Sequence, residues 1–98
     1  MTFEVRLLKE AKKDYDNLDN SLKIHVKKSF QKLQIVGGHA GEALRGTLTG
    51  YRKLKHRKLG LRIIFRQVAN KIEIIEVVAI GKRSDSEIYK IAEKRIRE

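Results

Sequence analysis

Apolar and charged residues alternate at the start of the chain. Phe3, Val5 and Leu7 fall on one side of residues 2–8, and charged residues separate them. A period of two is typical of a β-strand that buries one face. We therefore expect residues 2–8 to form the first strand.

The pattern then changes to helical spacing. Residues 9–18 form a polar stretch with apolar side chains three and four positions apart, and residues 21–34 carry a longer apolar stripe. Asp19 and Asn20 supply turn and N-cap chemistry between the two predicted helices. Two glycines at positions 37 and 38 end the second helix. Its apolar stripe consists of Leu22, Val26, Phe30 and Leu33.

Strand patterns dominate the second half of the chain. A glycine-rich connection at residues 39–50 precedes three candidate strands, at residues 51–56, 61–68 and 71–80. Ser84 and Glu87 match a capping box, which predicts that the last helix begins there. The predicted order is β-α-α-β-β-β-α, an α+β fold with a mainly antiparallel four-stranded sheet and the helices on one side. The length fits a single domain over residues 1–98.

The chain is strongly basic. Its 98 residues include 23 Lys and Arg against 12 Asp and Glu, which gives a net charge of +11. Such an excess repels itself in the compact state and is commonly tolerated where the partner is a polyanion. Composition therefore favours a nucleic-acid partner, with a basic protein that binds no polyanion as the alternative.

Several classes of protein are excluded by what the sequence lacks. The chain has no cysteine, which excludes disulfides, thiolate nucleophiles and Cys-based metal centres. No stretch approaches the roughly 18 apolar residues of a membrane helix, and the N-terminus has no signal-like apolar segment. We expect a cytoplasmic protein without membrane contact. No zinc-type His cluster, carboxylate pair, Ser-His-Asp set or phosphate-binding Gly loop occurs, so we expect no metal and no cofactor.

Eight basic residues and no acid lie between positions 45 and 66. If residues 57–60 form a four-residue hairpin loop, position 55 pairs with 62 and position 53 with 64. Lys53, Lys55 and Arg62 then share the face of the sheet that points away from the helices. We expect a basic surface on an exposed sheet there, with a solvated strand face that binds no ligand as the alternative. The eight residues are Arg45, Arg52, Lys53, Lys55, Arg57, Lys58, Arg62 and Arg66.

The next connection sets a second register. A tight turn at Ala69-Asn70 pairs Arg66 with Glu73, which predicts a structural ion pair. The same register places Glu76 beside Ile63 on the core-facing side. A bulge or a shifted register would remove that conflict.

Lys, Arg and Tyr side chains suit the cleavage of RNA without a metal. In that reaction the ribose 2′-hydroxyl attacks the adjacent phosphorus, and fixed cations stabilise the charge that develops on the phosphate oxygens. A lysine among other cations gives up its proton more readily, and arginine binds phosphate through its planar fork.

Taken alone, Tyr89 is explained as a side chain that covers the edge of the core, and Arg83 as a charged residue of a loop. We expect His25 and His39 to be exposed and His56 to point toward the core.

Several short motifs occur in a characteristic order. They are Leu44-Arg45-Gly46, Lys53-Leu54-Lys55-His56-Arg57, Gly60-Leu61-Arg62, Gly81-Lys82-Arg83 with Ser86-Glu87-Ile88-Tyr89, and Lys94-Arg95-Ile96. In order and spacing they resemble the RelE toxins, and the resemblance covers essentially the whole chain. It implies the RelE/ParE-like fold and a ribosome-dependent mRNA endoribonuclease that inhibits translation.

The resemblance also implies site residues and partners. It places the active site on Lys53, Lys55, Arg62, Arg83 and Tyr89. Lys55 would be the general base, Arg62 would steady the phosphate, and Lys53 would position it. Arg83 would stabilise charge or protonate the leaving 5′-oxygen, and Tyr89 would stack on or orient the RNA. We expect further RNA contacts from Arg45, Arg57, Lys58 and Lys82. The partners implied are mRNA, the ribosome, an acidic antitoxin that wraps the toxin, and operator DNA through the antitoxin complex.

Two departures and two alternatives accompany this interpretation. The spacing before Lys53 is one residue longer than the family pattern, and His56 replaces the usual aliphatic residue. The YoeB-like branch uses a Glu and a His as acid and base, and the lack of an acid in this region argues against that branch.

The first alternative is a ParE-like gyrase inhibitor without nuclease activity, whose members generally lack the full Lys-Lys-Arg-Arg-Tyr set. The second is a plain nucleic-acid-binding module.

Overall fold

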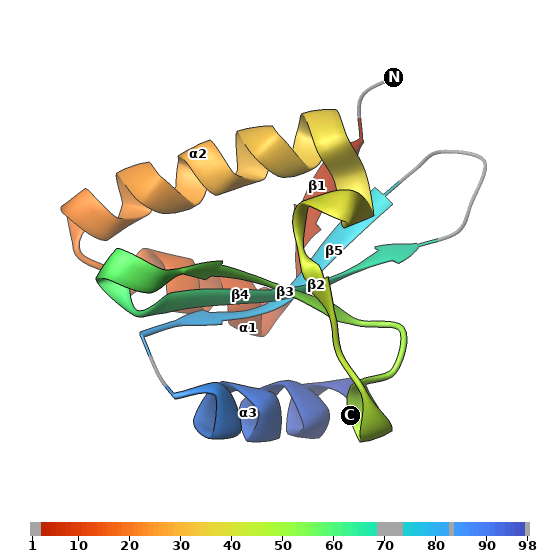
Figure 1. Ribbon diagram of the computed structural model, residues 1–98. Helices are drawn as coiled ribbons and strands as arrows, with labels where there is room; N and C mark the ends of the chain where they lie inside the picture. The colour runs from red at the N-terminus through yellow and green to blue at the C-terminus, as the bar shows by residue number, and fades with distance from the viewer. Residues whose placement is uncertain (1–2, 69–73, 83, 98) are drawn as a thin grey trace.

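The computed structural model describes residues 3–68, 74–82 and 84–97 (Figure 1). The strands and α-helices follow the predicted order, with one additional short strand. They are β1 (Glu4–Leu7), α1 (Lys9–Asp16), α2 (Asn20–Val36), β2 (Glu42–Ala43), β3 (Arg52–His56), β4 (Leu61–Val68), β5 (Ile74–Gly81) and α3 (Asp85–Arg97). Three short 3-10 turns connect them, η1 (Gly37–Ala40), η2 (Gly46–Leu48) and η3 (Arg57–Leu59). The prediction of an α+β fold is confirmed.

The sheet has the order β1-β5-β4-β3-β2. β1 pairs with β5 in parallel, and the other three strand pairs are antiparallel. The prediction of a mainly antiparallel sheet is therefore correct, although a fifth strand is present. The additional strand, β2, lies inside the segment expected to be irregular, where two residues pair with the edge of β3.

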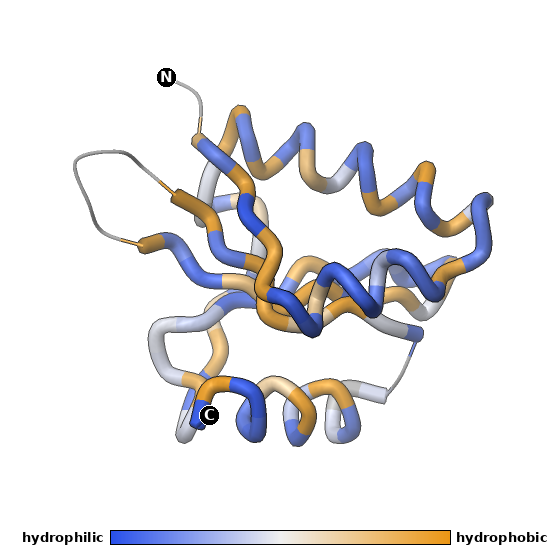
Figure 2. The backbone as a smooth tube through the Cα atoms, turned by 180° about the vertical axis from the view of Figure 1, so that it is seen from behind, coloured by the Kyte–Doolittle hydropathy of each residue, from blue (hydrophilic) through white to orange (hydrophobic). Residues whose placement is uncertain are grey.

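Helices cover both faces of the sheet, whereas the sequence analysis placed them on one side. Ala11 of α1 and Val26 of α2 pack with Phe65 and Ile75 in one buried cluster. On the other face, α3 contributes Ile88 and Ala92 to a second cluster. That second cluster also contains Leu48, Ile64, Val78 and Ala79. Figure 1 shows α2 and α3 on opposite sides of the strands. The smoothed chain in Figure 2 alternates in hydropathy along α2 and α3.

A bulge in β5 corrects the predicted register of β4 and β5. Ile64 pairs with Ala79 and Phe65 with Val77, so Val78 is an extra residue opposite this step. Arg66 consequently pairs with Glu76, not with Glu73, and Ile63 lies opposite Ile80, not beside Glu76. Val68 pairs with Ile74, so the predicted pairing of position 68 with position 71 was wrong. Residues 69–73 lie outside the described part of the chain.

An ion pair closes the edge of β5 that β1 leaves uncovered. β1 pairs with β5 only as far as Val77. Beyond that point, Ile80 N donates to Asp14 Oδ2 (3.0 Å) and Arg95 Nη1 donates to the carbonyl of Val78 (3.0 Å). Asp14 and Arg95 also bind each other through two contacts of 2.6 and 3.1 Å. The pair thus joins α1, β5 and α3 and satisfies backbone groups that would otherwise lack partners.

The predicted cap of α3 by Ser84 is confirmed, and the Ser84 and Glu87 side chains contact each other. Glu87 N donates to Ser84 Oγ at 3.2 Å, and Ser84 Oγ donates to Glu87 Oε1 at 3.4 Å. These bonds satisfy a free N–H in the first turn and fix the point at which the chain turns from β5 into α3. Within the described residues, no helix has both the length and the apolar character needed to cross a membrane.

Candidate functional site

The hairpin between β3 and β4 has the predicted register. His56 pairs with Leu61, Lys55 with Arg62 and Lys53 with Ile64. The connection consists of η3 and Gly60, whose φ of 65° is a left-handed conformation that favours glycine. The four-residue loop therefore forms as expected, and it fixes which side chains share a face.

Lys53, Lys55 and Arg62 lie on the same face of the sheet. Their face also carries Ile64, which packs in the α3 cluster. The expected bare sheet surface was thus wrong, because α3 covers part of this face. The three cations lie on the part of the face that belongs to the hairpin. Lys55 is exposed, whereas Lys53 and Arg62 are half-buried.

The helix α3 brings Tyr89 to this cationic group. The Nζ atom of Lys53 lies 5.7 Å from the centroid of the Tyr89 ring, within the range of a cation–π contact. Tyr89 also packs against the cluster of Ile64 and Ile88. It therefore covers the edge of the core and at the same time presents its ring beside the predicted site.

Some of the remaining predicted site residues lie next to this cationic group, and others do not. Arg57 and Lys58 are exposed on η3, two and three positions beyond Lys55. Gly81 pairs with Arg62, so the end of β5 delivers the exposed Lys82 next to the site. The exposed Arg45 lies at the other end of β3, before η2, and is not brought to the cationic group. Arg83 falls outside the described residues.

Sequence reasoning missed one acid at the site. Glu42 of β2 pairs directly with Lys53, so its exposed carboxylate lies on the same side of the sheet edge. A hollow of about 230 Å³ is lined here by Ala40, Gly41, Glu42, Lys53, Leu54, Lys55 and Arg57. Glu42 precedes the basic segment and was assigned to an irregular connection, so only the formation of β2 places it there.

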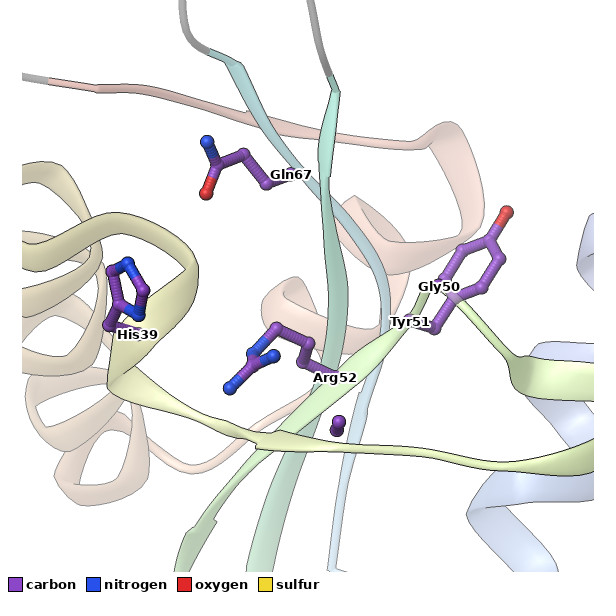
Figure 3. Close-up of a pocket in the computed structure, with 6 residues that line it drawn as sticks. His39, Gly50, Tyr51, Arg52 and Gln67 are labelled. Carbon is purple, nitrogen blue, oxygen red and sulfur yellow. The ribbon is translucent and has the colours of Figure 1, made fainter.

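A second hollow lies on the opposite side of β3. It has a volume of about 260 Å³ and is lined by His39, Ala43, Gly50, Tyr51, Arg52 and Gln67. Figure 3 shows the side chain of Arg52 on the same side as His39, whereas Tyr51 extends to the other side of the strand. Arg52 Nη2 donates to the carbonyl of Gly41 at 2.6 Å, which fixes the loop before β2. None of the predicted site residues lines this hollow.

His56 points toward α2, as expected, and joins a polar cluster there. A short hydrogen bond connects its Nε2 to Ser29 Oγ, and Ser29 Oγ donates to the carbonyl of His25 at 3.1 Å. Ser29 thus links the His56 ring to the backbone of α2. The His25 ring lies 6.3 Å from that of His56. His25 is half-buried, so the expectation that it is exposed was wrong. His39 is exposed, as expected.

We predict that protonation of His56 destabilises the protein. Burial lowers its pKa below the ordinary value of 6.5, and repulsion from His25 and Lys32 lowers the pKa further. Below pH 6.5 the unfolded chain therefore binds this proton before the folded chain does, so stability decreases as the pH falls toward the lowered pKa. Urea unfolding between pH 7.5 and 5 measures the decrease, which His56→Leu should reduce. The matched control His39→Gln should leave it unchanged, and an equal decrease in the His56→Leu protein contradicts the prediction.

Groups of three or more metal-ligating side chains are absent from the described part of the chain. The site comprises the cations, the ring of Tyr89 and the carboxylate of Glu42. Lys53, Lys55 and Arg62 can hold a phosphate, and Tyr89 can contact a base.

Solved structures of small, basic α+β toxins share the fold of this chain. A free form of Escherichia coli toxin RelE carrying two substitutions superimposes with a TM-score of 0.78 at 26% identity, covering 98% of this chain and 99% of that one. The same toxin bound to a peptide of the antitoxin RelBc gives a TM-score of 0.73 at 25% identity, covering 94% of this chain and 95% of that one.

Sequence comparison gives the same class. An Escherichia coli protein named RelE-like toxin is 33% identical over 97 residues, which are 99% of this chain and all of that protein. The mRNA interferase toxin RelE of Escherichia coli K12 is 31% identical over 96 residues, which are 98% of this chain and 95% of that protein. No protein-family model matches the chain. By identity and coverage, the chain belongs to the RelE-like toxins.

Proposed function

We propose that this protein is a ribosome-dependent mRNA endoribonuclease of a type II toxin–antitoxin system. One observation carries the proposal: Lys53, Lys55 and Arg62 share a face of the sheet on which Tyr89 lies against Lys53. Such a group provides cations for a scissile phosphate and a ring for a neighbouring base. The substrate is mRNA in the ribosomal A site, and its cleavage stops translation.

The chemistry requires no metal, because RNA supplies its own nucleophile. Lys55 accepts the proton of the ribose 2′-hydroxyl as the oxygen attacks phosphorus. Arg62 and Lys53 stabilise the charge on the non-bridging oxygens. The bond from phosphorus to the 5′-oxygen breaks, and Arg83 stabilises or protonates that oxygen. Tyr89 stacks on the RNA and holds it in line.

Basic residues at the rim extend the contact with RNA. Arg57 and Lys58 on η3 and Lys82 after β5 are exposed next to the cationic group. Each supplies an electrostatic contact to the phosphate backbone. Arg45 lies farther away and would contact a more distant part of the strand.

The proposal includes the partners of a cytoplasmic toxin. An acidic antitoxin complements the net charge of +11, and the related RelE toxin has been solved with an antitoxin peptide. In this proposal the antitoxin complex, and not the toxin alone, binds operator DNA. The single domain of residues 1–98 carries the activity.

The products of the reaction test the proposal. Brief induction followed by primer extension should reveal new 5′ ends within translated mRNA, and none when ribosomes are absent. Attack by the 2′-hydroxyl leaves a 2′,3′-cyclic phosphate and a 5′-hydroxyl, which end-specific enzymatic labelling distinguishes from metal-dependent hydrolysis. Growth arrest with intact mRNA and inhibited DNA gyrase would instead establish the ParE-like alternative. RNA binding without cleavage or arrest would indicate a binding module.

A further inference from the structure

The sheet face that carries Lys53, Lys55 and Arg62, here called the cationic face, holds a second pair of a cation and an aromatic ring besides Lys53 and Tyr89. Tyr51 directly precedes β3, two residues before Lys53. Arg66 lies on β4, two residues after Ile64, which is the partner of Lys53. Alternation along the strands therefore places Tyr51 and Arg66 on the same face as Lys53. Figure 3 shows that Tyr51 extends to the side of β3 opposite Arg52.

The guanidinium of Arg66 is held in place from two sides. Its Cζ lies 5.6 Å from the centroid of the Tyr51 ring, and its Nε donates to Glu76 Oε1 at 3.1 Å. This bond uses the Nε–H of the guanidinium. The Arg66 side chain is 42% exposed. It is thus ordered before a ligand arrives, which lowers the entropic cost of binding.

This arrangement repeats the one at the cleavage site. Lys53 lies over Tyr89, and Arg66 lies over Tyr51. Tyr51 and Lys53, one member of each pair, are two residues apart along the same chain segment, which corresponds to about 7 Å in a strand. Unpaired bases stack on aromatic rings and on guanidinium planes, and each base has a face that stacks without regard to sequence. Two such pairs in succession suit successive nucleotides of one strand.

A purely structural role explains less of what is present. An exposed Arg–Glu pair contributes little to stability, as at Arg6 and Glu4, where the atoms lie 2.9 Å apart on the edge strand β1. The pair at Arg66 differs in two respects: it has an aromatic ring beneath it, and it faces the same side as Lys53 and Lys55. Arg6 therefore provides a matched control.

We propose that Tyr51 and Arg66 form a nucleobase subsite, in which a base next to the scissile phosphate stacks on the guanidinium plane of Arg66. The cation–π contact with Tyr51 and the hydrogen bond to Glu76 hold the guanidinium in place. This inference rests on the proposed RNA cleavage and extends it to a neighbouring nucleotide. It assigns Arg66 to substrate binding and not to the proton transfers.

Cleavage of ribosome-bound mRNA under single-turnover conditions tests the subsite. Arg66→Lys retains the charge but loses the plane, and Tyr51→Ala loses the support. Each should raise the half-saturating toxin concentration about tenfold, as expected for the loss of one stacked base, while the rate at saturation stays near that of the wild type. The control Arg6→Lys should match the wild type. An unchanged half-saturating concentration in both variants, or an equal rise in the control, overturns the inference.

A binding measurement separates this inference from the cleavage proposal. The probe is a short single-stranded RNA with 2′-O-methyl groups, which block cleavage, and 2-aminopurine at successive positions. Stacking on Arg66 should quench the fluorescence at one position, and Arg66→Lys should restore it. Quenching that persists in Arg66→Lys overturns the subsite. Failure of the wild-type protein to cleave translated mRNA overturns the proposed function, whatever the fluorescence shows.

Discussion

Lys55→Ala and Arg83→Ala are each expected to abolish the growth arrest that follows expression of this protein. Lys55 is the exposed lysine opposite Arg62, and we propose that it accepts the 2′-hydroxyl proton. Loss of a general base lowers a rate by about 100-fold or more. Loss of Arg83 removes charge stabilisation from the leaving oxygen. Colony formation after induction and primer extension of a reporter mRNA measure both effects.

The control for these variants is Lys28→Ala. Lys28 is exposed on α2, which packs on the opposite face of the sheet, so its removal changes the net charge equally without touching the site. This variant should remain toxic. Circular dichroism should show that all three variants are folded. If Lys55→Ala and Arg83→Ala both remain fully toxic, the active-site assignment is wrong.

The second large effect concerns stability. Asp14→Asn should lower the free energy of unfolding by about 2 kcal/mol, because the carboxylate accepts bonds from both Arg95 and the Ile80 amide. The side chains of Asp14 and Arg95 are 21% and 17% exposed, so the loss should be smaller than for a fully buried pair. The melting temperature should fall by on the order of 10 °C.

Asp16→Asn provides the matched control, since Asp16 is exposed on the same helix. Hydrogen exchange adds a local readout: the amides of α3 should exchange faster in Asp14→Asn, because Arg95 ties that helix to β5. A melting temperature within 1 °C of the wild type would show that the ion pair is not a stabilising contact.

The hairpin that carries the site could be predicted because local chemistry determines it. The turn residues and the alternation on either side of Gly60 set the register, and the register sets which cations share a face. The capping box at Ser84 was predictable for the same reason, since its two partners lie three residues apart. The predicted pairing of β4 with β5 failed because the bulge at Val78 has no comparable local signal.

The covering of both sheet faces had a signal that the sequence analysis did not use. Residues 63–65 of β4 and 77–80 of β5 are all buried, and a nearly continuous apolar run indicates a strand covered on both faces. The apolar run of residues 71–80 indicated a central strand, but it was not taken to mean that helices cover both faces of the sheet. Helix periodicity shows which side of a helix is buried, but it does not show which face of the sheet receives that side.

By itself, the sequence determined the α+β class, the hairpin register, the cationic face and the membership in the RelE-like toxins. These properties depend on residues close together in the chain or on short motifs in order. Only the tertiary structure decided that α3 lies across the cationic face, that Tyr89 meets Lys53, and that Asp14 binds Arg95. These contacts join residues that are distant in the sequence, and they form together when helices pack on both faces of the sheet. A local sequence pattern therefore does not predict any one of them.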